Sequence, residues 1–198
     1  MIATVVFDLG GVLCRFDPEA RVRALAAASG WSSDAVRAHV WGSGRDADAD
    51  SGRLTVAEAF ALASLDGALD VATVLACWRA AFAPDADVLA IAERVSVPRA
   101  VLTNNGPVVE ALFSDQLAPV AERCSPVMLS WRLGATKPSR EVYDRAAARL
   151  ERSPDELLMV DDTTRNVDGA RAAGWDAIEF AGADELAGEM RARGLTAG

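Results

Sequence analysis

Residues 3–13 read Ala-Thr-Val-Val-Phe-Asp-Leu-Gly-Gly-Val-Leu, so an apolar run leads into an aspartate and then a pair of glycines. The run 3–8 has the β-branched and aromatic residues of a buried strand, which would place Asp8 at the end of that strand. Gly10 and Gly11 lack Cβ atoms, so the backbone there can approach a bulky anion and point amide groups at it. An Asp before Gly is also an ordinary turn residue, so this segment alone is weak evidence for an anion-binding site.

The rest of the 198-residue chain alternates short apolar runs with Ala-rich amphipathic stretches. This alternation predicts an α/β fold in which βα units surround a mainly parallel sheet. The predicted strands are 3–8, 99–103, 126–129, 157–161 and 176–180. Ligands bind at the carboxyl ends of the strands in open α/β sheets, so the polar residues that end these strands are candidates for a site.

About ninety residues between the first two predicted strands look wholly helical. One helix is predicted to begin at Asp17-Pro18 and end at Gly30, and Thr55 with Glu58 forms a capping box for another. An apolar stripe at helical spacing predicts a further helix and comprises Val71, Val74, Leu75, Trp78 and Phe82. A βα crossover needs far fewer residues, so we predict a small helical cap at 15–85, inserted after the first strand of a core formed by 1–14 and 86–198.

Three further clusters carry polar groups suited to phosphate chemistry. Leu102-Thr103-Asn104-Asn105-Gly106 offers a hydroxyl and amides that could hold phosphoryl oxygens, although a plain Asn-Gly turn would look the same. Lys137, followed by Pro138, is a compact charge that could bridge a carboxylate and a phosphate, although most surface lysines do not. Asp161 and Asp162 are adjacent carboxylates, which repel each other unless a cation lies beside them. A hard divalent ion would relieve that repulsion, and capping of the next helix by one acid is the simpler alternative.

The composition excludes several classes of protein. Asp and Glu outnumber Lys and Arg by 29 to 20, and a net charge of −9 disfavours a nucleic-acid partner. The three cysteines are far apart and form no Cys-x-x-Cys pair, which argues against disulfides or zinc and indicates a cytoplasmic protein. We find no signal peptide and no apolar run near the roughly 18 residues that a membrane span needs, so no membrane partner is expected.

Taken in order, Asp-x-Gly-Gly-Val, Leu-Thr-Asn, Lys-Pro and Asp-Asp resemble the haloacid dehalogenase superfamily, which has a Rossmann-like core. The chain looks most similar to bacterial sugar-phosphate phosphatases of the α-glucose-1-phosphate phosphatase type. Further likenesses are Ser130, Tyr143, Asn166 and Gly174. The resemblance spans nearly the whole chain and is least specific in the cap.

The resemblance implies a Mg²⁺-dependent phosphatase that acts on a small phosphorylated metabolite such as a sugar phosphate. Asp8 would attack phosphorus and form an aspartyl-phosphate that water hydrolyses. Thr103 and Lys137 would orient and neutralise the transferring phosphoryl group. The resemblance further implies phosphate-binding roles for Gly11, Asn104 and Asn105, and Mg²⁺ ligation by Asp8, the Gly10 carbonyl and Asp162, with Asp161 ligating directly or through water.

One position departs from the pattern of many superfamily phosphatases, which carry a general acid two residues after the nucleophile. Gly10 occupies that position here. General acid–base catalysis is commonly worth about 10² to 10⁴ in rate, so we expect either a substrate with a good leaving group, such as an anomeric or acyl phosphate, or a proton donor from the cap. The candidate cap residues are Trp41, Arg45, Asp46, Asp48, Asp50 and Arg53.

Two other functions compete with the phosphatase. A metal-free 2-haloacid dehalogenase of the same superfamily would use a segment similar to 102–106, but Asp161 and Asp162 favour the metal-dependent enzyme. The second alternative is a non-catalytic binding or regulatory protein with this fold, which would have no physical reason to retain mutually repelling carboxylates. The oligomeric state and the physiological substrate do not follow from the sequence.

Overall fold

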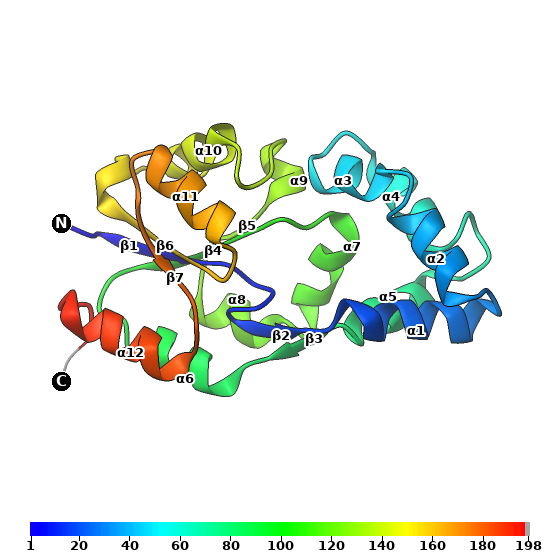
Figure 1. The fold of residues 1–198 in the computed structure, drawn as a ribbon, viewed down its shortest axis with the longest axis horizontal. Coiled ribbons are helices and arrows are strands. Elements are labelled where there is room, and N and C mark those ends of the chain that lie inside the picture. Colours follow the sequence, from blue (N-terminus) through cyan, green and yellow to red (C-terminus); the bar gives the residue numbers. More distant parts are fainter. Residues whose placement is uncertain (197–198) are drawn as a thin grey trace.

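The computed structural model describes residues 1–196, and its centre is a five-stranded parallel sheet (Figure 1). The strand order is β5-β4-β1-β6-β7. The bounds are β1 (Thr4–Phe7), β4 (Arg99–Thr103), β5 (Val127–Leu129), β6 (Leu157–Asp161) and β7 (Asp176–Glu179). The α/β class and all five predicted strands are confirmed. Because β1 lies in the middle, the chain builds outward on one side through β4 and then crosses to the other through β6, which creates a crevice at the carboxyl ends of these three strands.

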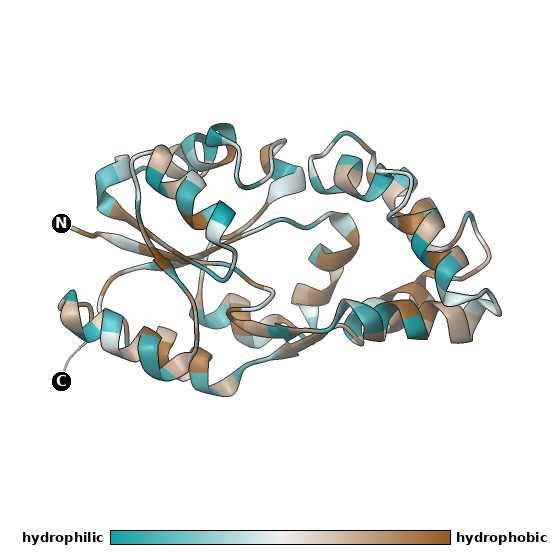
Figure 2. Ribbon diagram, viewed as in Figure 1, coloured by the Kyte–Doolittle hydropathy of each residue, from teal (hydrophilic) through white to brown (hydrophobic). Residues whose placement is uncertain are grey.

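Both faces of the sheet are buried, as expected for parallel strands covered by helices. Val5 and Phe7 belong to one hydrophobic cluster and Val6 to the other, so alternate β1 side chains point to opposite faces. Helices α10 and α11 pack on the face of Val6, and α6, α8 and α12 pack on the opposite face (Figure 1). Hydrophobic residues run through the strands, and the surrounding helices carry hydrophilic stretches (Figure 2).

The helices of the sheet region are short. They are α6 (Ala86–Glu93), α7 (Pro107–Glu110), α8 (Ala118–Arg123), α9 (Ser130–Leu133), α10 (Arg140–Leu150), α11 (Thr164–Ala172) and α12 (Ala183–Ala192), with 3₁₀ turns η1 (Ala111–Ser114) and η2 (Pro154–Glu156). Within residues 1–196 we find no helix with the length and apolar character needed to cross a membrane. The three cysteines are buried and free.

Five helices follow the first strand, in the region where the sequence predicts a helical segment. They are α1 (Pro18–Ser29), α2 (Ser33–Val40), α3 (Arg45–Asp50), α4 (Val56–Ala63) and α5 (Val71–Arg79). The Asp17 carboxylate accepts a hydrogen bond from the Ala20 amide at the start of α1, and Gly30 ends that helix with a φ of 74°. Thr55 and Glu58 form both bonds of the predicted capping box. The local helix signals are therefore confirmed.

The region is not wholly helical, contrary to the sequence-based expectation. Strands β2 (Cys14–Phe16) and β3 (Phe82–Pro84) pair antiparallel where the chain enters and leaves the helical segment. Helix α5 ends at Arg79, so Phe82 lies in β3 and packs against Phe16, with ring centroids 4.9 Å apart. Three-residue strands are too short to show a period-two pattern, which explains the error. The predicted cap limit at residue 15 lies within this ribbon and the limit at residue 85 directly follows it, and the division into cap and core stays a prediction.

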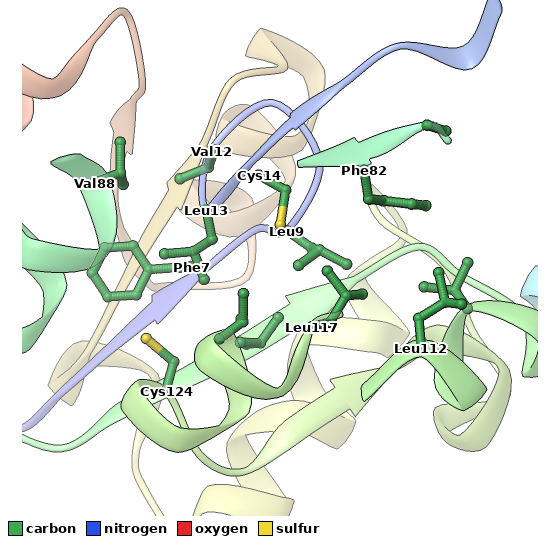
Figure 3. Packing of buried hydrophobic residues seen from close by; sticks show 14 of the residues in the cluster. Phe7, Leu9, Val12, Leu13, Cys14, Phe82, Val88, Leu112, Leu117 and Cys124 are labelled. Atoms are coloured by element: carbon green, nitrogen blue, oxygen red, sulfur yellow. The ribbon is translucent and has the colours of Figure 1, made fainter. Parts of the chain in front are cut away.

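A single apolar cluster connects the sheet to the helical segment. It includes Phe7 and Leu9 around β1 and continues through Phe82 to Val74 and Trp78 of α5. Figure 3 shows the part around Phe7, Leu9 and Phe82, where the side chains converge between the sheet and the neighbouring helices. The helical segment is therefore packed onto the sheet region rather than tethered to it.

Candidate active site

The predicted site residues meet at the carboxyl ends of the central strands. Asp8 directly follows β1, Thr103 ends β4, and Asp161 ends β6. Phe7 is paired with Val101 on one side and Val160 on the other, so these strand ends lie at one edge of the sheet, on the side that faces the helical cap (Figure 1). A cavity of about 280 Å³ opens there and is lined by Asp8, Gly10, Phe16, Phe82, Thr103, Asn104, Asn105, Lys137, Asp162, Thr163 and Asn166.

Lys137 lies between two buried carboxylates. Its side chain is almost inaccessible, and its Nζ is 2.9 Å from Asp8 Oδ1 and 2.5 Å from Asp161 Oδ2. Burial acts to lower the pKa of Lys137, but the two carboxylates outweigh burial and raise it, so the ammonium is charged at neutral pH. The lysine thus holds a fixed positive charge beside Asp8.

The Asn104 side chain positions this lysine by binding its backbone. Its Oδ1 accepts a hydrogen bond from the Lys137 amide at 2.8 Å, and its Nδ2 donates to the Lys137 carbonyl at 2.9 Å. Both ends of the Asn104 side-chain amide are engaged by the Lys137 backbone, and because Asn104 also lines the cavity, its expected role in phosphate binding stays a prediction. Asn104 therefore joins the loop after β4 to the loop that carries the lysine.

Asn105 and Thr103 form a second pair. The Asn105 Nδ2 donates to Thr103 Oγ1 at 2.7 Å, while the Asn105 backbone amide donates to Ser130 Oγ at 3.0 Å. Because the Thr103 hydroxyl accepts the Asn105 bond, its own proton is free to donate into the cavity. A donor of this kind suits a phosphoryl oxygen.

The two adjacent acids have different surroundings. Asp161 is fully buried; besides Lys137 on Oδ2, its Oδ1 accepts from the Thr163 amide at 2.9 Å and from Asn166 Nδ2 at 3.0 Å. Asp162 is exposed and lines the cavity. One carboxylate oxygen from each of Asp8, Asp161 and Asp162 lies within 4.8 Å of the others, which is compatible with a shared cation.

The charge balance of this cluster also favours a cation. Three carboxylates face one ammonium, and burial, opposed by Lys137 and reinforced by Asp161, raises the pKa of Asp8. Burial and Asp161 likewise raise the pKa of Asp162. Asp8 Oδ1 is inaccessible and lies close to Lys137 without accepting a hydrogen bond from the described residues. A divalent ion with oxygen ligands would compensate this excess of negative charge.

Gly11 is required by the position of Asp162. Its φ is +87°, and a Cβ built on it would lie 2.1 Å from Asp162 Oδ2. The turn is closed by the Gly11 amide donating to the Cys14 carbonyl at 2.8 Å. Of the glycine pair predicted to admit an anion, Gly11 lies against the carboxylate of the chain's own Asp162, whereas Gly10 faces Phe16, and the phosphate-binding role of Gly11 stays a prediction.

The family model for haloacid dehalogenase-like hydrolases matches residues 2–174, which include every residue of this cavity. The chain belongs to the haloacid dehalogenase-like hydrolases. The predicted superfamily is thus confirmed, and the protein is a hydrolase.

Three similar proteins extend the comparison of this hydrolase. D-ribitol-5-phosphate phosphatase from Bacteroides thetaiotaomicron is 26% identical over 90% of this chain and 92% of its own. A phosphatase from Mycobacterium tuberculosis is 31% identical over 87% of this chain and 84% of its own. A haloacid dehalogenase family enzyme of B. thetaiotaomicron, crystallised with magnesium and inorganic phosphate, has a TM-score of 0.73 and 18% identity, covering 90% of this chain and 93% of that one. The last similarity establishes the fold.

Several residues of the hydrolase site were not assigned a role from sequence. Asn166 binds Asp161, and the Tyr143 hydroxyl donates to the Asn166 carbonyl at 2.6 Å. Phe16 and Phe82 bring the β2–β3 ribbon to the cavity wall. Of the cap residues proposed as proton donors, Trp41, Asp46 and Asp50 line a second cavity, whose described lining does not include Arg45, Asp48 or Arg53. That second lining also contains Arg21, which no sequence pattern singled out.

Proposed function

We propose that this hydrolase is a Mg²⁺-dependent phosphatase that removes the phosphoryl group of a small phosphorylated metabolite, with Asp8 as the nucleophile. The observation that carries the proposal is the placement of Asp8 beside a buried lysine, a free hydroxyl donor and an open carboxylate in one cavity. Two similar proteins are phosphatases, and a structural neighbour binds magnesium and inorganic phosphate.

The donor set fits a hard dication. Asp8 and Asp162 would hold Mg²⁺ together with the Gly10 carbonyl. The bound ion would offset the carboxylate charge and the charge of the phosphoryl oxygens. Asp161 already accepts bonds from Lys137, Thr163 and Asn166, so its main contribution is to fix the lysine, and direct ligation by Asp161 has less support than ligation by Asp162.

The residues of the cavity account for both halves of the hydrolysis. A carboxylate oxygen of Asp8 attacks phosphorus and forms a P–O bond, while the bond to the leaving oxygen breaks and its electron pair departs with that oxygen, which takes a proton from solvent. Lys137 and the Thr103 hydroxyl stabilise the charge on the transferring group. In the second step water attacks the same phosphorus, the bond to Asp8 breaks, a proton passes from the water to solvent, and inorganic phosphate leaves.

Asp162 distinguishes this proposal from the metal-free dehalogenase. Its carboxylate lines the cavity beside Asp8, and partial desolvation and the neighbouring Asp161 raise its pKa, an electrostatic cost that a bound cation would offset. We expect no halide release from a 2-haloacid in the presence of a chelator. Such release would favour the dehalogenase instead.

The direct test is phosphate release from a panel of sugar phosphates, nucleotides and acyl phosphates with and without Mg²⁺. We expect Asp8→Asn to lower activity by about 10³-fold or more for every substrate, because the amide is not a nucleophile. Asp34→Asn is the matched control, since the Asp34 side chain is 98% exposed and lies on α2. An Asp8→Asn variant that keeps wild-type activity, or an enzyme indifferent to chelator, would refute the mechanism.

A further inference from the structure

A second cavity lies between the helical cap and the loop after β4. Its volume is about 240 Å³, and its walls come from α1, α3, α4 and α5 on one side and from 104–109 on the other. Phe16, Asn104 and Asn105 line both this cavity and the one that contains Asp8. The two cavities therefore adjoin at these three residues, so a substrate whose phosphate lies at Asp8 can extend its remaining atoms into the second cavity.

Arg21 of α1 is the cation of this second cavity. It is 9% exposed, and its guanidinium carbon lies 4.9 Å from the Trp41 ring centroid, 5.0 Å from that of Trp78 and 5.7 Å from that of Phe16. The Arg21 Nε is buried and has no hydrogen-bond acceptor among residues 1–196. Burial lowers the pKa of Arg21 to about 10, which leaves it charged at neutral pH. A buried charged donor left without an acceptor is costly, so the arrangement calls for a ligand oxygen.

Two carboxyl groups stand on α3 beside the guanidinium. The Asp50 backbone carbonyl accepts a hydrogen bond from Ser130 Oγ at 2.6 Å, and its carboxylate lies beside Gly106, so Asp50 is anchored to the sheet region. Burial and the neighbouring Asp46 raise the pKa of Asp50 to about 7. Burial also raises the pKa of Asp46. The cavity therefore presents one cation and two acids.

This combination selects the charge of the ligand. A second anionic group would be repelled by Asp46 and Asp50, and an ammonium group would be repelled by Arg21. Hydroxyl groups satisfy both, because they accept from the guanidinium and donate to the carboxylates. The faces of Trp41 and Trp78 provide apolar surface for the carbon chain that bears those hydroxyls.

We propose that Arg21, Asp46 and Asp50 bind the uncharged, hydroxyl-bearing part of the substrate and exclude substrates with a second anionic group. The inference rests on the proposed phosphatase activity for the position of the phosphate, and it adds the residues that choose the leaving group. The three are binding residues and carry no step of the chemistry.

Calorimetric titration of the Asp8→Asn enzyme with Mg²⁺ separates the two cavities, because it needs no turnover. The probes are inorganic phosphate, D-ribitol 5-phosphate, and 5-phospho-D-ribonate, in which a carboxylate replaces the terminal hydroxymethyl group. We expect ribitol 5-phosphate to bind at least tenfold more tightly than either of the others. Adding the substitution Arg21→Met, which keeps the apolar contact with the rings, should raise the dissociation constant of ribitol 5-phosphate about 10- to 100-fold. The dissociation constant of inorganic phosphate should change less than threefold.

Two further variants locate the effect. Arg45→Met is the matched control for Arg21, because Arg45 is a more exposed arginine of the same cap, and it should change none of the three affinities. Asp50→Asn should narrow the preference for ribitol 5-phosphate over 5-phospho-D-ribonate, whereas Asp48→Asn, on the same helix, should not. Equal binding of the two organic phosphates, or an Arg21→Met enzyme that binds all three like its parent, would overturn the inference. Absence of inorganic phosphate binding to the wild-type enzyme with Mg²⁺, which does not consume this probe, would count against the phosphatase instead.

Discussion

Replacing Lys137 by methionine tests how the cluster of charges is held together. The variant keeps an apolar stem of similar length but leaves Asp8 and Asp161, which are 8% and 0% exposed, without their shared cation. Removing one partner of a buried ion pair typically costs about 3–5 kcal/mol. That is a large part of the 5–15 kcal/mol by which a domain is usually stable, and for a chain of this size it corresponds to a fall of about 6–20 °C in Tm.

Urea unfolding without metal, followed by circular dichroism, measures this loss directly. The double variant Lys137→Met/Asp161→Asn should recover much of it, because the fully buried carboxylate is then neutral and its Thr163 and Asn166 partners remain. Saturating Mg²⁺ should also stabilise Lys137→Met more than wild type, since the ion replaces the missing positive charge near Asp8. The reasoning is refuted if the single variant loses less than about 1 kcal/mol, or if the double variant is no more stable than the single one.

Three other perturbations address separate parts of the molecule. Gly11→Ala should raise the apparent dissociation constant for Mg²⁺ at least tenfold, because the new Cβ would overlap Asp162 Oδ2 at a φ of +87°; Mg²⁺ titration of the purified variant measures this, and unchanged affinity would show that Asp162 is not a ligand. Asp50 has a pKa raised to about 7, so the folded protein holds its proton more tightly than the unfolded chain, and its contribution to stability is full below about pH 4 and declines as pH rises to about 7. The stability difference between wild type and Asp50→Asn should therefore change over that pH window, and a difference independent of pH would contradict the assigned shift. Because Gly10 supplies no general acid, kcat/KM for anomeric or acyl phosphates should exceed that for simple alkyl phosphates by about 10²-fold or more, whereas equal values would mean that a proton donor is present.

The five strands and most of the catalytic cavity followed from the sequence because their signals are local. Each strand is a short apolar run, and Asp8, Thr103 and Asp161 stand at strand ends, which a parallel sheet brings to one edge. The same rule does not reveal hydrogen-bond partners. Asn104 and Lys137 are 33 residues apart, and only the fold shows that the asparagine is engaged by the backbone of the lysine.

The second cavity was beyond the reach of sequence patterns. Arg21 lies in α1 and its aromatic neighbours come from β2, α5 and the end of α2, so no spacing along the chain connects them. The burial of Arg21 also cannot be predicted, because charged residues on a helix are normally solvated and nothing in the sequence marks this one as buried. The acidic run 46–50 was noticeable, but only the structure separates Asp46 and Asp50 from Asp48.

The antiparallel pairing of Cys14–Phe16 with Phe82–Pro84 fixes the two ends of the helical segment next to each other. The chain leaves the sheet region through β2 and returns through β3, and these two strands are paired. The length of the segment between them therefore does not change the positions of its two ends. Loop-closure entropy grows only with the logarithm of length. Helices can therefore be added to or removed from this segment at little entropic cost, while its two ends and the sheet edge that carries Asp8 keep their positions.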